Sequence, residues 1–122
     1  MIVLVTGGRD FNNVRVIGET LDCFHAAHPF DLLVRGCATG VDTIAAVWAM
    51  ERGIQPVGCP ALWDFHGKAA GAKRNSAMLA LEPDVVIVFP GGRGTANMRA
   101  LAIAVGVTVI DSGDIPHSDL VS

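Results

Sequence analysis

The sequence alternates between short apolar runs and longer segments in which apolar residues recur every three or four positions. The runs are rich in β-branched residues and span residues 2–5, 31–34, 54–57, 85–89 and 107–110. Because they are apolar at almost every position, they are typical of strands that are covered on both faces. The intervening segments have the spacing of amphipathic helices. The pattern therefore predicts five strands separated by four helices.

Two glycines mark the ends of predicted helices. Gly53 and Gly106 each stand before a predicted strand, where a left-handed helix cap favours glycine. Repeated strand–helix–strand units form parallel sheets with right-handed crossovers. We therefore predict an α/β fold, a single Rossmann-like three-layer domain with a five-stranded parallel sheet flanked by helices. It spans residues 1–111, and a polar C-terminal tail follows at residues 112–122.

The composition limits the partners of such a domain. Nine Lys and Arg residues against twelve Asp and Glu residues leave a formal net charge of -3, so no broad positive surface is expected to hold nucleic acid or an anionic membrane. No apolar run approaches the ~20 residues that span a bilayer. The three cysteines form no CxxC pair, which argues against disulfides and a structural zinc site. We expect a cytoplasmic protein, in the host cytoplasm if it is virally encoded, with no metal and no cofactor.

The ligands of parallel α/β sheets bind at the carboxyl edge of the strands, where the strand-to-helix loops lie. In this chain these loops contain most of the basic residues. Six of the nine Lys and Arg residues fall there: Arg9, Arg35, Lys68, Lys73, Arg74 and Arg93. A mildly acidic chain therefore has a predicted cationic rim at one edge of its sheet.

The loop after the fourth predicted strand is rich in glycine and opens a helix. Its candidate ligand residues are Pro90, Gly91, Gly92, Arg93, Gly94 and Thr95. Glycines let backbone amides approach a ligand closely, and a helix N-terminus offers free N–H groups with a partial positive charge, so this loop is predicted to bind a phosphate. Alternatively, the glycines serve only a tight turn and Thr95 caps the helix.

A second candidate phosphate loop follows the first predicted strand. It consists of Gly7, Gly8, Arg9, Asp10 and Phe11. Gly7 and Gly8 allow a ligand to approach the backbone, and Arg9 can form a forked contact with an oxyanion. The alternative is an ordinary strand-to-helix turn, with Asn12 and Asn13 as caps of the helix that follows.

The loop before the second predicted helix carries an acidic residue. Its candidate ligand residues are Gly36, Ala38, Thr39, Gly40 and Asp42. Thr39, three residues before Asp42, resembles a capping box with Asp in place of Glu. The alternative is that Asp42, or the loop carboxylate Asp10, accepts a hydrogen bond from a ribose hydroxyl, as acidic residues do in dinucleotide-binding folds.

The longest loop crowds cations near the start of the third predicted helix. Lys68, Lys73 and Arg74 lie where the helix macrodipole disfavours positive charge by about 0.3–1 kcal/mol each. An anionic ligand is a physical reason for this placement. Asn75 offers an amide to a base or a sugar. Trp63 either stacks on a base or anchors the loop against the sheet.

In these four loops the sequence resembles the SLOG superfamily, a Rossmann-like group that includes the DNA-uptake protein DprA and the LOG phosphoribohydrolases. The likeness is greatest to its small YspA-like, YpsA-related branch. The matching stretches are residues 6–11, 36–42, 63–75 and 89–95. The resemblance implies a ligand derived from a nucleotide, such as an ADP-ribose-type or cyclic nucleotide signal.

The resemblance also bears on catalysis. LOG enzymes have the motif PGGxGTxxE, whose closing glutamate is catalytic, and the corresponding residue here is Met98. A thioether neither accepts a proton nor stabilises an oxocarbenium ion. LOG-type hydrolysis would therefore need Asp10, Asp42 or Asp64 as a substitute. Relatives often carry an arginine in the loop where Thr39 stands here.

Three functions are compatible with these residues. The first is non-catalytic binding of a phosphate-bearing nucleotide derivative, as a sensor or a sequestering protein, because many SLOG domains resemble receptors for nucleotide signals in conflicts between bacteria and phages. The second is a LOG-like phosphoribohydrolase or nucleotide N-glycosidase. The third, DprA-like handling of single-stranded DNA, is disfavoured by the net charge of -3. Neither nucleic acid nor a membrane is expected as a partner.

Homo-oligomerisation, as a dimer or higher, is also predicted. An apolar domain of 122 residues is expected to cover a hydrophobic helix face in a symmetric interface. One candidate face carries Leu101, Ile103 and Val105 on the fourth predicted helix. The other lies on the alanine-rich second helix.

Overall fold

The computed structural model describes residues 1–60 and 67–116, apart from the side chain of Lys68. Its five strands are β1 (Ile2–Thr6), β2 (Leu32–Gly36), β3 (Gln55–Cys59), β4 (Val85–Val88) and β5 (Thr108–Asp111). Its helices are α1 (Val14–Ala27), α2 (Val41–Glu51), α4 (Ala70–Leu79) and α5 (Arg93–Ala104), with short 3-10 helices η1 (Gly67–Ala69) and η2 (Ser112–Asp114). Every strand and helix that the sequence predicts is present, with small shifts at the ends.

All five strands are parallel and lie in the order β3-β2-β1-β4-β5. The predicted Rossmann-like sheet is confirmed. The order runs outward in both directions from the β1–β4 pair, which is the point where such sheets open a crevice at their carboxyl edge. Thr6 at the end of β1 lies beside Val88 at the end of β4, so the loops after these two strands leave the sheet side by side.

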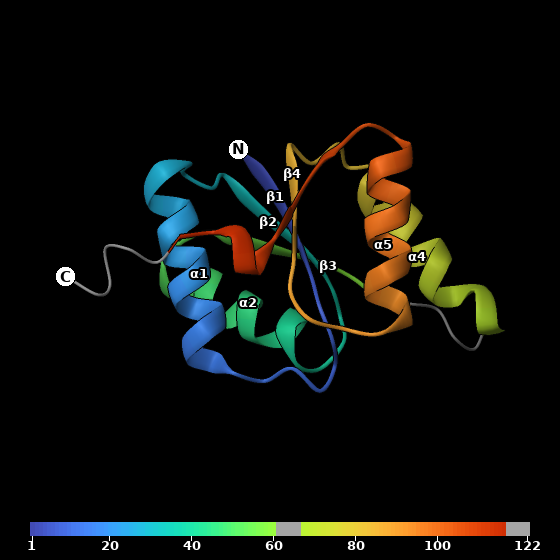
Figure 1. Ribbon diagram of the computed structural model, residues 1–122, viewed down its shortest axis with the longest axis horizontal. Coiled ribbons are helices and arrows are strands. Elements are labelled where there is room, and N and C mark those ends of the chain that lie inside the picture. The colour runs from blue at the N-terminus through green and yellow to red at the C-terminus, as the bar shows by residue number, and fades with distance from the viewer. Residues whose placement is uncertain (61–66, 117–122) are drawn as a thin grey trace.

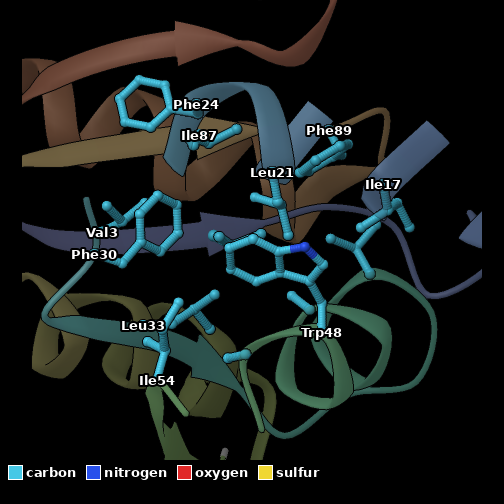
Figure 2. Packing of buried hydrophobic residues seen from close by; sticks show 14 of the residues in the cluster. Val3, Ile17, Leu21, Phe24, Phe30, Leu33, Trp48, Ile54, Ile87 and Phe89 are labelled. Carbon is cyan, nitrogen blue, oxygen red and sulfur yellow. The ribbon is translucent and has the colours of Figure 1, made fainter. Parts of the chain in front are cut away.

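Two pairs of helices cover the two faces of the sheet (Figure 1). α1 and α2 pack on one face, and α4 and α5 pack on the other. β1 contributes to both layers because successive side chains of a strand point to opposite faces. Val3 and Val5 belong to the cluster with Trp48, whereas Leu4 belongs to the cluster with Met98. Figure 2 shows the indole of Trp48 in the middle of the first cluster.

The edge strands are less covered than the sequence predicts. All residues of β4 are buried, whereas no residue of β3 or β5 is buried. The prediction that every strand is covered on both faces is therefore wrong for β3 and β5. The reason is geometric, since two helices on each face cover the centre of a five-stranded sheet and leave its outer strands partly open.

Three predictions about helix ends are confirmed. Asn13 caps α1, because its side chain accepts a hydrogen bond from the Val16 N–H at 3.1 Å. Gly53 follows α2 with a φ of 70°, and Gly106 follows α5 with a φ of 82°. Glycine adopts this left-handed conformation without the steric cost of a Cβ.

The chain still contributes to the core beyond residue 111. Ile115 is 7% exposed and packs in the cluster of α1 and α2. Residues 117–122 of the predicted tail lie outside the described residues. In the part of the chain that the structure describes, no helix is long and apolar enough to cross a membrane.

Two helices present apolar side chains on their outer faces. Near the end of α5, Ile103 and Val105 are exposed while Leu101 is half-buried. The alanines of α2 are all buried in the core of this chain, and Val47 and Met50 are exposed on that helix instead. Oligomerisation through either face stays a prediction.

Candidate functional site

A pocket of about 610 Å³ opens at the carboxyl edge of the sheet, over the β1–β4 switch point. Its volume lies in the range of roughly 300–1,000 Å³ that is common for small-molecule sites. Sixteen of the predicted ligand residues line it: Gly7, Gly8, Arg9, Asp10, Phe11, Gly36, Ala38, Asp42, Arg74, Asn75, Pro90, Gly91, Gly92, Arg93, Gly94 and Thr95. The fold therefore brings segments from four separate parts of the chain to one wall.

The remaining predicted ligand residues are not found in the described pocket wall. Among the described residues, Thr39, Gly40 and Lys73 are not part of the pocket wall. Trp63 lies outside the described residues, and the side chain of Lys68 is not described. Their roles in ligand binding stay predictions.

Three residues of the wall were missed by the sequence reasoning. They are Thr6, Gly71 and Met78. Thr6 is the last residue of β1, next to the first glycine-rich loop, and Met78 lies one helical turn after Arg74 on α4. Helical spacing from Arg74 is the signal that could have found Met78.

The two glycine-rich loops touch backbone to backbone. The Gly8 N–H donates a hydrogen bond to the carbonyl oxygen of Pro90 at 2.8 Å. A Cβ on Gly8 would lie 3.0 Å from the Cα of Gly91, and a Cβ on Gly91 would lie 2.7 Å from the nitrogen of Gly8 and collide with Thr95. Packing between the loops therefore requires glycine at position 91 and leaves little room for a side chain at position 8.

The start of α2 is held by the β1–α1 loop rather than by a local capping box. The N-cap residue is Gly40, with a φ of 72° and no side-chain cap. The Val41 N–H donates to the carbonyl oxygen of Gly8 at 3.4 Å, and a Cβ on Gly40 would collide with the carbonyl oxygens of Gly8 and Arg9. The capping-box interpretation of Thr39 is therefore wrong.

The first turn of α5 contains glycines of a different kind. A Cβ on Gly92 or Gly94 would meet no other atom within 4 Å. Gly94 lies within the helix, so the backbone does not require glycine at that position. The helix has no side-chain cap, which contradicts the alternative role of Thr95 as a cap. The first N–H groups of α5 therefore have no partner within the helix and lie at an open part of the pocket wall.

A buried carboxylate and an arginine converge at the inner end of the pocket. Asp42 is 6% exposed, and its Oδ2 accepts a hydrogen bond from the Ala38 N–H at 3.3 Å. A Cβ on Gly36 would lie 2.9 Å from this Oδ2 and would collide with the guanidinium of Arg74. Glycine at position 36 thus leaves the space in which both charged side chains approach the sheet.

The environment of Asp42 favours a protonated carboxyl group. Burial raises the pKa of Asp42 from 3.8 to about 6, although the Ala38 N–H and the positive charges of Arg74, Arg35 and Arg9 lower it. Desolvation thus exceeds the combined effect of three guanidinium groups. A carboxyl group with this pKa can accept or donate a hydrogen bond to a ligand near neutral pH.

Asn75 joins the two helices that border the pocket. It is 2% exposed, and its side-chain amide donates to the carbonyl oxygen of Gly94 at 3.1 Å and to Oδ1 of Asn97 at 3.0 Å. Its Oδ1 accepts a hydrogen bond from Nε of Arg74 at 3.1 Å. Both amide hydrogens are engaged by the protein, so Asn75 ties α4 to the first turn of α5 and orients Arg74.

Met98 does not contribute to the pocket wall. It is 0% exposed and packs with Leu4, Val34 and Val86 in the core beneath α5. The position that holds the catalytic glutamate in the LOG motif therefore holds a core residue here. Among the described residues, the carboxylates of the wall are Asp10 and Asp42.

Comparison with known proteins agrees with the fold and the loops. Residues 1–66 match YAcAr, described as the YspA, cpYpsA-related SLOG family. The chain belongs to this SLOG family. The matched segment covers β1 to β3, with the β1–α1 and β2–α2 loops of the pocket. The resemblance seen in the sequence is confirmed, and membership of the SLOG family indicates a nucleotide-related function.

A phage protein is similar over nearly the whole chain. The "Gene 61 protein" of Mycobacterium phage D29 is 37% identical over 123 residues, which cover 93% of this chain and 98% of the phage protein. No solved structure shows a significant match. The similarity to the phage protein extends beyond the family match, over α4 and α5.

Proposed function

We propose that this SLOG protein binds the phosphate of a nucleotide-derived small molecule at the first turn of α5, as a non-catalytic sensor or sequestering protein. The observation that carries the proposal is Gly94, in the first turn of α5. Neither packing nor backbone conformation requires glycine there, and Gly within a helix costs about 0.5–1 kcal/mol relative to Ala. Close approach of an oxyanion to the free amides is a physical reason to keep it.

The charges around this turn support an anionic ligand. Arg9, Arg74 and Arg93 line the same pocket, although the chain has a net charge of -3. Guanidinium groups bind phosphate oxygens through paired, charge-assisted hydrogen bonds. A local cluster of this kind attracts a small anion without a broad positive surface, which disfavours nucleic acid as the ligand.

The buried Met98 and the phage relative support capture rather than turnover. The core position of Met98 removes the carboxylate that LOG enzymes use. A relative encoded by a phage is consistent with a protein that sequesters a nucleotide signal of the host's defence in the host cytoplasm. Binding without chemistry is sufficient for that role.

Titration calorimetry with AMP, ADP-ribose and cyclic nucleotides tests this proposal. We expect binding by the wild-type protein and a loss of at least about tenfold in affinity, about 1.4 kcal/mol, for Gly94→Ala. The matched control is Gly18→Ala in α1, whose added Cβ would make an ordinary contact 4.0 Å from Trp48. No binding of any of these ligands, or equal loss in both variants, would contradict the proposal.

The pKa of Asp42 favours one alternative, a nucleotide N-glycosidase. A wall carboxyl group with a pKa of about 6 titrates closer to neutral pH than an ordinary Asp, which suits a general acid or base. Prolonged incubation of each nucleotide followed by chromatography separates the two functions. We expect intact nucleotides. Release of free base by the wild-type protein but not by Asp42→Asn would establish the enzyme instead.

A further inference from the structure

A second, smaller hollow of about 380 Å³ lies at the same edge of the sheet, over the ends of β4 and β5. Its wall combines the β4–α5 loop with the outer side of α5 and with the residues that follow β5, including Ala96, Arg99, Ser112 and Gly113. In Figure 1 the β4–α5 loop is orange and the chain that leaves β5 is red. None of these four residues contributes to the larger pocket.

The β4–α5 loop and the start of α5 lie between the two hollows. Pro90, Gly91, Gly92 and Thr95 belong to both walls. The larger pocket lies on the β1 side of this loop and the smaller hollow on its β5 side. A group bound at the amides of Gly92 therefore stands between the two spaces.

The smaller hollow offers polar groups suited to a sugar. Arg99 and Asp111 form a two-point ion pair, with Nε to Oδ1 at 3.3 Å and Nη2 to Oδ2 at 3.1 Å. Both side chains are 46% exposed, so the remaining lone pairs of Asp111 can accept hydrogen bonds from hydroxyl groups. Ser112 adds a hydroxyl at the same wall.

We propose that the ligand has two parts joined through phosphate, with one nucleoside in the larger pocket and a second sugar-bearing group in the smaller hollow. This inference rests on the proposed function and names its ligand class, a pyrophosphate-linked nucleotide rather than a mononucleotide. The phosphates lie at the first turn of α5, and the Arg99–Asp111 pair contacts the second sugar. Each space falls within or near the volume range of small-molecule sites, roughly 300–1,000 Å³.

The test compares ADP-ribose with AMP in titration calorimetry. We expect the wild-type protein to bind ADP-ribose at least about tenfold more tightly than AMP. Ala96 is exposed on α5 and lines the smaller hollow but not the larger pocket. The substitution Ala96→Phe therefore adds a ring at the smaller hollow. We expect it to remove this preference by weakening ADP-ribose binding about tenfold while the affinity for AMP is unchanged.

Two further variants make the result specific. Gly113→Leu fills the hollow from its other wall, where an added Cβ meets no atom within 4 Å, and it should reproduce Ala96→Phe. Ala104→Phe, also exposed on α5 but outside both hollows, should leave both affinities unchanged. Circular dichroism verifies that each variant is folded.

The outcomes separate the two proposals. The two-part ligand is wrong if the wild-type protein binds AMP and ADP-ribose equally. It is also wrong if Ala96→Phe and Gly113→Leu weaken the binding of both ligands to the same extent, or the binding of neither. In each of these cases phosphate binding stands. If the wild-type protein binds neither AMP nor ADP-ribose, the two-part ligand is wrong, and the proposed function falls as well if the cyclic nucleotides also fail to bind.

Discussion

The glycines where the loops meet differ from the glycines at the first turn of α5, although both groups line or support one pocket. At Gly40 and Gly91 an added Cβ would collide with the β1–α1 loop, and at Gly8 it would make a tight contact with the β4–α5 loop. At Gly92 and Gly94 it would meet nothing. The first group is explained by packing between the loops, whereas packing does not explain the second, for which we propose a role in ligand binding.

Asp42 belongs with the second group. Its burial raises its pKa to about 6, which means that its charged form opposes folding at neutral pH. A residue that destabilises the fold at a pocket wall is typical of functional sites. The pocket therefore contains two kinds of residue. Some hold the two loops together, and others do not stabilise the fold.

The largest effect is expected for Gly40→Ala. The positive φ of Gly40 costs an L-residue about 1–2 kcal/mol, and the collision of the new Cβ with two carbonyl oxygens adds overpacking of about 1–3 kcal/mol. Urea unfolding should show the free energy of unfolding lowered by roughly 3 kcal/mol. An unchanged midpoint would show that the loops do not need this glycine.

Asp42→Asn should instead stabilise the protein at neutral pH. Between pH 3.8 and about 6, the folded protein keeps a proton that the unfolded chain has released, so this group's contribution to stability falls as the pH rises. Above that range the charged Asp42 lowers the free energy of unfolding by its full amount, about 3 kcal/mol at most. Urea unfolding of both proteins at several pH values should give a difference that grows from pH 4 to about 6 and then levels. A difference that shrinks as the pH rises would place Asp42 with the residues that hold the fold.

Asn75→Ala tests the link between α4 and α5. It leaves the Gly94 carbonyl, Oδ1 of Asn97 and Nε of Arg74 without their partner at a buried position, so a loss of roughly 1–3 kcal/mol is expected. Thermal unfolding measures it, with Asn12→Ala at an exposed loop position as the control. Equal stability of the two variants would mean that the amide faces the ligand, as the sequence predicted.

The smallest effect on stability is expected for Gly94→Ala without ligand. Alanine is the better helix former by up to about 1 kcal/mol, and its Cβ has open space. Thermal unfolding should show a slightly raised midpoint, similar to that of Gly18→Ala. A marked loss of stability would move Gly94 into the group that the fold requires and would weaken the argument for phosphate binding.

The strands and helices could be predicted because their signals are local. The apolar run at Val85–Val88 predicts a strand, and the four-residue spacing of Ile17 and Leu21 predicts a helix. Asn13 and Gly53 indicate helix ends because of their side-chain and backbone chemistry. Thr39 shows where local reasoning fails. Its spacing to Asp42 resembles a capping box, yet the carbonyl oxygen of Gly8 receives the N–H of Val41 instead.

The sequence by itself determined the α/β class, the SLOG family and the set of loops at the carboxyl edge, because glycines, arginines and apolar runs carry those signals where they stand. Only the tertiary structure placed β1 beside β4, and with that pairing brought Gly8 against Gly91. It also decided which glycines serve packing and which face open space, and it buried Asp42 among three arginines. These properties depend on distances between segments far apart in the chain, which no local pattern records.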